Sequence, residues 1–223
     1  MAILGHARGI NTAMGPYDIW HQQTAFELPE PSPVEIKSTR DSDSADDIGA
    51  RQIIIYGLPR WGAAEQSEVL EMDGTTPIET ANDYVFCNRL ECLAFGDSRC
   101  NTGTITATMH GQQVCAVPPK MGHSLDCVRA IPSGQELRIT ALRSHAGRSN
   151  QRHSADIALM VQHEADNPMS GWSVLHVGGL GEQQFATQLS IEGPAVVKAT
   201  ALFSTAPELW CSIDAFLAPS EQP

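Results

Sequence analysis

The sequence predicts an all-β protein folded as a β-sandwich, jelly-roll-like, with an extended N-terminal arm. Short apolar or alternating runs, rich in Ile, Val, Leu and Thr, recur along the chain and are the pattern of half-buried strands. Clusters of Gly, Pro, Asp and Ser separate these runs and favour tight turns. No long segment carries the 3.6-residue apolar period of a helix. Strands joined by loops of mixed length favour a jelly roll over an immunoglobulin fold.

A β-meander within residues 46–106 is the best-defined part of the pattern. Three strands are predicted there, and Asp73-Gly74-Thr75 makes one of the turns between them. Outside the meander, the 110–112 stretch predicts a tight turn between two strands of a hairpin. The predicted strands are 34–38, 52–56, 67–72, 83–93, 104–109, 113–117, 124–130, 136–143, 155–163, 172–177, 185–191, 195–203 and 208–217.

The chain is expected to consist of an arm, one domain and a short end. Residues 1–33 are the predicted arm, 34–218 the sandwich and 219–223 a frayed C-terminus, because glycines break the arm and alternating prolines stiffen its exit. The arm carries the apolar residues Tyr17, Ile19, Trp20 and Phe26. We expect them to pack on a neighbouring subunit; the alternative is a loose tail.

Composition limits the partners that the chain can have. The 223 residues carry a net charge of −12, which repels a nucleic-acid backbone, and no apolar stretch is long enough for a membrane helix. We therefore expect neither nucleic-acid nor membrane binding. Most of the six cysteines fall at apolar positions of strands, and none has the spacing of metal ligands, so buried, reduced thiols are expected.

No pattern of enzymatic chemistry stands out, so we expect no catalytic residues, no metal and no cofactor. Nucleophile-elbow, phosphate-loop and paired-histidine motifs are all missing from the sequence. The acidic loop around residues 41–47 offers carboxylates to a hard cation, but its spacing is not that of an EF-hand. A solvated loop is the favoured interpretation, with a cation site left open; its carboxylates are Asp41, Asp43, Asp46 and Asp47.

Twelve positions within the meander carry a resemblance to a known family. They are Gly57, Leu58, Glu68, Leu70, Gly74, Thr75, Thr76, Asn88, Arg89, Asn101, Gly103 and Ile105. In type and spacing they resemble a widespread β-rich family of structural proteins of tailed bacteriophages. Pro59, Trp61 and Asp73 depart from the family's pattern. The resemblance implies structural roles for the matching residues.

The resemblance implies a non-enzymatic virion protein that is assembled in the host cytoplasm. It would form a homo-oligomer, a trimer or higher, and contact other virion proteins such as the major capsid protein. Decorating or stabilising the capsid, or a head-fibre-like attachment, is the expected role. The alternatives are a neck or tail component, or a carbohydrate-binding module for host glycans that stacks sugars on Trp61, Trp172 or Trp210.

Overall fold

The computed structural model describes seven segments of the chain, and all of their regular structure is β-strand. None of these segments forms a helix that is long and apolar enough to cross a membrane. The chain divides into two compact units: unit 1 comprises Met1–Gln23 and Asp126–Pro223, and unit 2 comprises Thr24–Leu125. The described residues are 2–8, 17–19, 30–146, 154–163, 170–178, 180–204 and 208–220.

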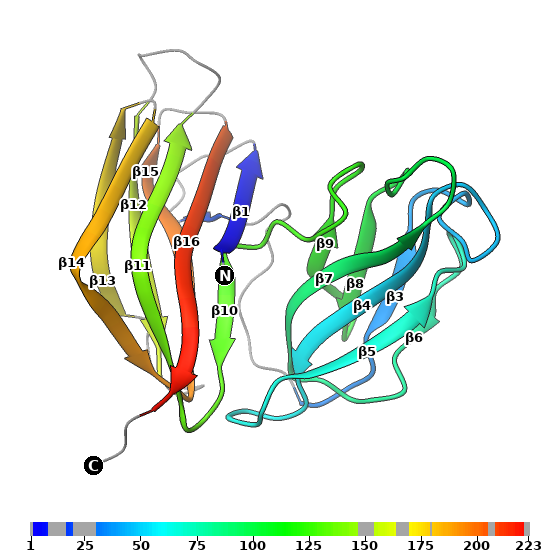
Figure 1. Cartoon of the computed structure of the whole chain (residues 1–223), viewed down its shortest axis with the longest axis horizontal. Helices are drawn as coiled ribbons and strands as arrows, with labels where there is room; N and C mark the ends of the chain where they lie inside the picture. Colours follow the sequence, from blue (N-terminus) through cyan, green and yellow to red (C-terminus); the bar gives the residue numbers. More distant parts are fainter. Residues whose placement is uncertain are drawn as a thin grey trace. The chain divides into compact units, whose positions relative to one another are not determined.

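Unit 1 is built from two antiparallel sheets. One has the strand order β1-β16-β11-β14; the other has the order β10-β15-β12-β13, and β2 also pairs with β15. In Figure 1, β14, β11, β16 and β1 stand side by side, and β13, β12 and β15 lie behind them. The strands are β1 (Ala2–Arg8), β2 (Tyr17–Asp18), β10 (Val128–Ile131), β11 (Gln135–Ala146), β12 (Ser154–Gln162), β13 (Ser170–Gly178), β14 (Leu180–Glu192), β15 (Ala195–Ser204) and β16 (Glu208–Pro219).

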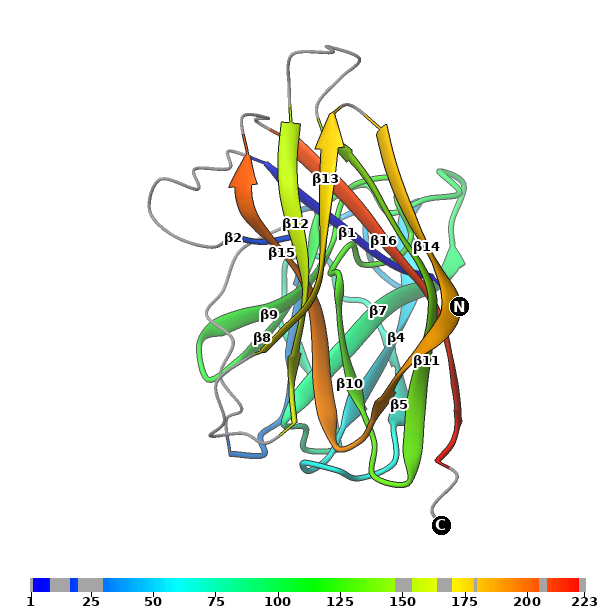
Figure 2. The same ribbon diagram turned by 90° about the vertical axis from the view of Figure 1, so that its left-hand side faces the viewer.

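The pairing in unit 1 follows one long hairpin wrapped into two sheets. With the two-residue strand β2 set aside, eight strands remain in chain order. The first pairs with the last (β1 with β16), the second with the seventh (β10 with β15), the third with the sixth (β11 with β14) and the fourth with the fifth (β12 with β13). From β10 to β16, each strand lies in the other sheet from the strand before it, except that β12 and β13 are neighbours in one sheet. Figure 2 shows these strands from the side.

The core of unit 1 lies between its two sheets. Alternate residues point inward, as the two-residue period of a strand requires, and Leu137 and Ile139 of β11 share one cluster with Ile157 and Leu159 of β12. All four side chains are fully buried. Apolar contact between the two inner faces therefore holds this sandwich together.

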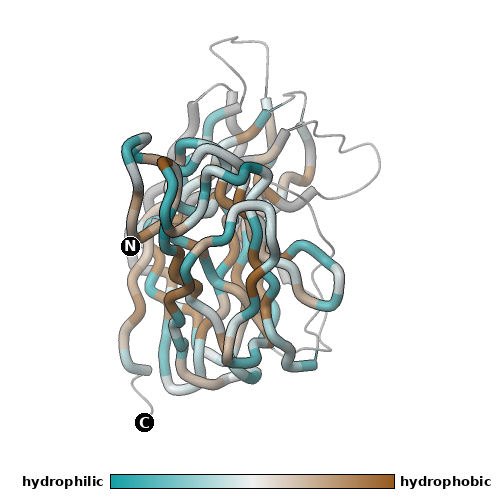
Figure 3. The backbone as a smooth tube through the Cα atoms, turned by 90° about the vertical axis from the view of Figure 1, so that its right-hand side faces the viewer, coloured by the Kyte–Doolittle hydropathy of each residue, from teal (hydrophilic) through white to brown (hydrophobic). Residues whose placement is uncertain are grey.

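Unit 2 is a smaller β-sandwich of two antiparallel sheets. Their strand orders are β6-β3-β8-β9 and β5-β4-β7, and residues from both sheets form one core cluster. Hydrophobic and hydrophilic positions alternate along its strands in Figure 3. The strands are β3 (Glu35–Ser38), β4 (Ala50–Leu58), β5 (Gln66–Glu71), β6 (Ile78–Glu79), β7 (Phe86–Phe95), β8 (Ile105–Met109) and β9 (Gln112–Val117).

Unit 2 is inserted between the first strands of unit 1 and β10. Ile19 and Cys127 belong to unit 1 on either side of the insertion, and both are hydrogen-bonded within unit 1. The Cys127 N–H donates to the Ile19 carbonyl (3.2 Å), and Ile19 and Ala199 are joined by an N–H···O bond of 3.1 Å. Ile19 and Cys127, one on each side of the insertion, are therefore neighbours along β15.

The all-β prediction is confirmed, and each predicted strand corresponds to an observed one. The expected division into an arm and one domain over 34–218 is wrong in two respects. The domain contains two separate cores, and residues 2–8 form strand β1, which pairs along its whole length with β16 of the same chain. The sequence did not predict β1, because small residues interrupt the alternation of apolar and polar residues in Ala-Ile-Leu-Gly-His-Ala-Arg.

The arm residues that the structure describes belong to unit 1. Tyr17 lies in β2, where its backbone is paired with Ala201, and Ile19 is fully buried in the unit 1 core. Ile19 therefore packs within its own unit, and the expectation that the arm packs on a neighbouring subunit stays a prediction for its other apolar residues. Trp20 and Phe26 lie outside the described residues. Of the expected frayed end, Pro219 closes β16 and the Ser220 N–H donates to the Gly134 carbonyl, while residues 221–223 lie outside the described residues.

Candidate functional site

Four of the twelve residues that carry the family resemblance lie in the loops around one buried carboxylate of unit 2. Asp43 is fully buried, in the loop that precedes β4. Its two oxygens accept hydrogen bonds from the Ser38 hydroxyl (2.6 Å) and from the backbone N–H groups of Ala50, Thr102 and Gly103 (2.8 Å each). These four donors join two loops that are distant in the sequence.

The hydrogen bonds decide the ionisation of this carboxyl. Burial of the Asp43 carboxyl raises its pKa, but the bonds from Ser38, Thr102, Ala50 and Gly103 outweigh burial and lower the pKa below its ordinary value of 3.8. Asp43 is therefore a charged structural anchor at neutral pH. Its lone pairs are directed at protein donors, which leaves little capacity for a cation.

Four residues of the resemblance shape the loops around Asp43. Gly74 has a φ of +60°, and a Cβ there would lie 2.7 Å from the Asp41 carbonyl oxygen, so only glycine fits. Thr75 donates its hydroxyl to the Asp41 carboxylate (2.5 Å). The buried Asn101 side chain donates to Gly103 and Pro118 carbonyls (2.8 Å each). These residues maintain loop geometry and do not converge on a reacting atom.

The other residues of the resemblance also have structural partners. Glu68 accepts from the Ala81 backbone (2.6 Å) and from both nitrogens of Asn82 (backbone 3.1 Å, side chain 2.8 Å), and so caps the chain after β6. The Asn88 amide donates to Glu65 (2.7 Å). Gly57 lies in β4, opposite Cys87 in β7.

Arg89 stacks its guanidinium on an aromatic ring. Its central carbon lies 4.0 Å from the centroid of Tyr56, which is a cation–π contact between neighbouring strands β7 and β4. The contact covers the outer surface of the sheet, away from the Asp43 loops. Like the other family-type residues, Arg89 thus stabilises unit 2.

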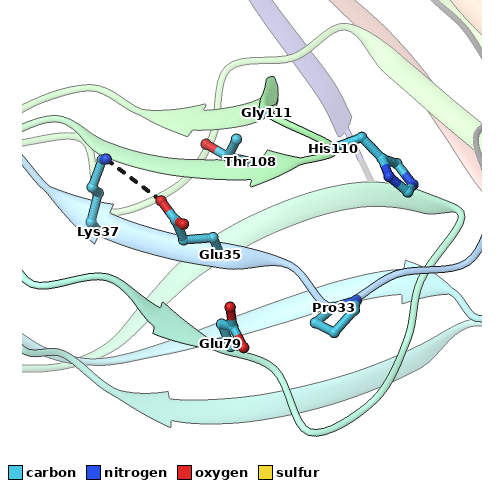
Figure 4. A pocket seen from close by; sticks show the side chains of 7 residues that line it. All are labelled: Pro33, Glu35, Lys37, Glu79, Thr108, His110 and Gly111. Carbon is cyan, nitrogen blue, oxygen red and sulfur yellow. Dashed lines mark ion pairs between the residues drawn. The ribbon is translucent and has the colours of Figure 1, made fainter.

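A polar groove lies on the outer face of the β6-β3-β8-β9 sheet and has a volume of about 500 Å³. Glu35 of β3 stands at its centre, because its register partners are Glu79 of β6 on one side and Thr108 of β8 on the other. Figure 4 shows these side chains on one face of the sheet. The residues that line the groove are Pro33, Glu35, Lys37, Glu79, Thr108, His110 and Gly111.

Two contacts fix the ends of this groove. The Lys37 ammonium lies 3.5 Å from the Glu35 carboxylate. The two residues are two positions apart on β3 and so lie on the same face of the strand. At the other end, His110 has a φ of +49° in the tight turn between β8 and β9, and its ring nitrogen hydrogen-bonds the Glu30 carbonyl (2.9 Å). The turn itself is the hairpin turn that the sequence predicted at residues 110–112.

The lining of the groove suits a ligand that offers hydroxyl groups. Carboxylates of Glu35 and Glu79 accept hydrogen bonds, while Lys37 donates them. None of the residues that line it is a Trp, Tyr or Phe, so a sugar there would be held by hydrogen bonds rather than by stacking. Sequence reasoning missed this groove, because the cross-strand neighbours of Glu35 are far from it in the chain.

The aromatic residues proposed for sugar stacking are not brought together with the groove. Trp61 lies half-buried in the turn before β5, and Trp210 is 37% exposed in β16 of unit 1. The side chain of Trp172 lies outside the described residues.

Within the described residues, no group of three or more His, Cys, Asp or Glu side chains could hold a metal ion. In the acidic loop, Asp41, Asp46 and Asp47 are exposed.

Comparison with known proteins finds no match for this chain among protein-family models, curated proteins or solved structures.

Proposed function

We propose that this chain is a non-enzymatic, multimeric structural protein of a bacteriophage virion, with unit 1 as a jelly-roll module. The observation that carries the proposal is the strand pairing of unit 1. An eight-stranded jelly roll is a long antiparallel hairpin wrapped into two sheets, and the pairs β1·β16, β10·β15, β11·β14 and β12·β13 have this order. Viral capsid proteins are a major class with this architecture.

Unit 2 supports the same proposal through its use of polar residues. The family-type residues, among them Asn101 and Glu68, are engaged in hydrogen bonds that hold loops and strand ends. This is what a module built for rigidity requires, and it agrees with the resemblance of residues 46–106 to structural proteins of tailed phages. Attachment to the outside of the capsid, as a decorating or head-fibre-like protein, is the role that we favour.

Exposed apolar side chains favour an assembled state. Trp210 (37% exposed) and Phe216 (40% exposed) lie at alternate-phase positions of β16, so both project from the outer face of its sheet. An interface with a second copy of the chain would cover both side chains, and aromatic residues are enriched in such interfaces. Light scattering on the purified chain should give the mass of a trimer or a higher homo-oligomer, and Trp210→Ala with Phe216→Ala should lower that mass.

The decisive experiment is to measure the composition of purified particles. Tailed-phage particles whose genome carries this chain would be isolated on a density gradient and their proteins quantified against the major capsid protein by mass spectrometry. We expect the chain in a fixed ratio to the capsid protein, with many copies for a capsid role and few for a neck or tail role. A chain that stays in the unassembled fraction and is absent from particles would contradict the proposal.

A second candidate function, binding of host glycans, is favoured by the groove around Glu35. The full-length chain would be applied to a glycan array, followed by Glu35→Gln and Glu79→Gln. If the groove binds, each variant should weaken binding about tenfold or more, the effect of losing one charge-assisted hydrogen bond. Glu71→Gln is the matched control, because Glu71 is exposed on β5 and does not line the groove.

A further inference from the structure

Two cysteines of unit 1 meet inside its core. Cys127, just before β10, is fully buried, and Cys211 of β16 is 4% exposed; both belong to the same core cluster. The Cys211 thiol is near enough to Cys127 to raise the pKa of its thiol. The Cys127 sulfur also lies 3.6 Å from the Ile3 carbonyl oxygen of β1.

The backbone on both sides holds this pair in place. The Cys127 N–H donates to Ile19 (3.2 Å), and its carbonyl accepts from Ala199 (3.0 Å). Cys211 is paired in the sheet with Gly5 of β1 and with Ser144 of β11. Both cysteines are therefore next to β1, Cys211 through its pairing with Gly5 and Cys127 through its contact with Ile3.

The two cysteines belong to different sheets of the sandwich. Cys211 lies in the β1-β16-β11-β14 sheet, whereas Cys127 leads into β10 of the other sheet. A covalent bond between them would therefore tie the two layers together, as the inter-sheet disulfide of an antibody domain does. It would also join residues far apart in the chain, which restricts the unfolded state strongly.

We propose that Cys127 and Cys211 form the site of an inter-sheet disulfide that closes when the chain meets a disulfide oxidant. With glutathione disulfide as that oxidant, one thiolate attacks it and releases one glutathione thiol. The second cysteine then attacks the mixed disulfide and releases the other glutathione thiol. The two cysteines lose two hydrogens in total, and the glutathione disulfide is reduced to two thiols.

The same environment keeps the pair reduced until the core opens. Burial and the neighbouring Cys211 raise the pKa of the Cys127 thiol well above its ordinary value, so little of the reactive thiolate exists in the closed sandwich. Strand β1 contacts the Cys127 thiol and lies at the edge of its sheet, where it pairs with β16 alone and can open more readily than a central strand. Closure is therefore slow in the native chain and fast during folding.

The test is disulfide mapping on the full-length chain. The reduced chain would be unfolded in guanidinium, refolded into a buffer of glutathione and glutathione disulfide, alkylated and digested for peptide mass analysis. We expect a protein lighter by two hydrogens, a Cys127–Cys211 peptide pair, and alkyl groups on the other four of the six cysteines. Native chain incubated with glutathione disulfide should give the same pair more slowly.

Two variants make the test specific. Cys211→Ser should abolish the loss of mass and leave Cys127 alkylated, whereas Cys115→Ser, which removes a buried cysteine of unit 2, should leave the pair intact. The oxidised wild-type chain should unfold at a higher urea concentration than the reduced chain, and dithiothreitol should remove this difference. Six alkylated thiols after oxidative refolding, or a bond from either cysteine to a cysteine of unit 2, would overturn the proposal. The wild-type map alone decides if Cys211→Ser does not fold.

Discussion

Asp43 is the residue on which the loops of unit 2 depend most. Its carboxylate is fully buried and accepts bonds from four donors, three of which are backbone N–H groups. A buried donor that loses its acceptor costs about 1–3 kcal/mol. If Asp43 is replaced by a residue without two acceptor oxygens, more than one of these donors is left without an acceptor.

We predict that Asp43→Asn destabilises unit 2 by at least about 2 kcal/mol, since the Asn amide nitrogen faces N–H donors. Urea unfolding of the variant, followed by fluorescence, measures the change. Asp41→Asn is the matched control, because Asp41 is exposed and its carboxylate accepts from Thr75. It should cost less than about 1 kcal/mol. Equal effects of the two substitutions would refute the anchoring role of Asp43.

The pH dependence of unit 2 should follow from the same carboxyl. The folded-state pKa of Asp43 lies below its ordinary value of 3.8, so its contribution to stability is present above that value. It is lost as pH falls through the folded-state pKa. Urea midpoints measured from pH 7 down to pH 2 should therefore fall at acid pH in the wild type, and less steeply in Asp43→Asn.

Tyr84 is a second residue whose environment gives a clear expectation. It is fully buried, and its hydroxyl has no hydrogen-bond partner. Burial, with the nearby Glu68 and Cys87 charges, raises the pKa of Tyr84 to about 12. We predict that Tyr84→Phe is neutral or stabilises unit 2 by about 1 kcal/mol, since it removes an unsatisfied polar group. A loss above about 1 kcal/mol in urea unfolding would mean that the hydroxyl is bonded.

At the scale of elements, β1 has the largest consequence for unit 1. It adds an edge strand to β16 over seven paired residues and buries Ile3 and Ala7 in the core. It also lies over the Cys127 thiol. A segment that makes these contacts is part of the sandwich, and its removal exposes one side of the core.

Deletion of residues 1–8 should therefore destabilise unit 1 and leave unit 2 unchanged. Hydrogen exchange read by mass spectrometry should show faster exchange in β16, whose outer partner is lost, and unchanged exchange in β4 and β7. Deletion of residues 221–223 is the control and should leave the exchange of both units unchanged. If the chain without residues 1–8 exchanges like the wild type, β1 contributes nothing to the fold.

At the scale of the whole molecule, the insertion of unit 2 suggests two independent folding units. Each unit has its own sheets and core cluster, and Ile19 and Cys127, one on each side of the insertion, are joined by hydrogen bonds to each other and to Ala199. A domain whose ends start close together can be removed at small cost to its host.

We predict that residues 24–125, expressed alone, fold cooperatively. Circular dichroism should give a β spectrum with a single urea transition. In the reciprocal chain, a short Gly/Ser linker would replace residues 24–125, and the remaining unit 1 should show its own transition. An excised unit 2 with no cooperative transition would mean that the two units fold as one.

The sequence by itself determined the class and the elements of this protein. Period-two alternation in stretches such as 208–217 is a local property, because strand residues face inward and outward in turn. It predicted every strand from β3 onward except the two-residue β6. Turn chemistry likewise located the His110-Gly111 turn.

Only the tertiary structure decided which strands pair and where domains end. Three arrangements join residues that are distant in the sequence. They are Glu35 between Glu79 and Thr108, Asp43 with the N–H groups of Thr102 and Gly103, and Cys127 beside Cys211. Pairing register depends on cross-strand packing, which one-dimensional alternation does not contain. For the same reason β1 looked like part of an arm: its partner, β16, lies at the other end of the chain.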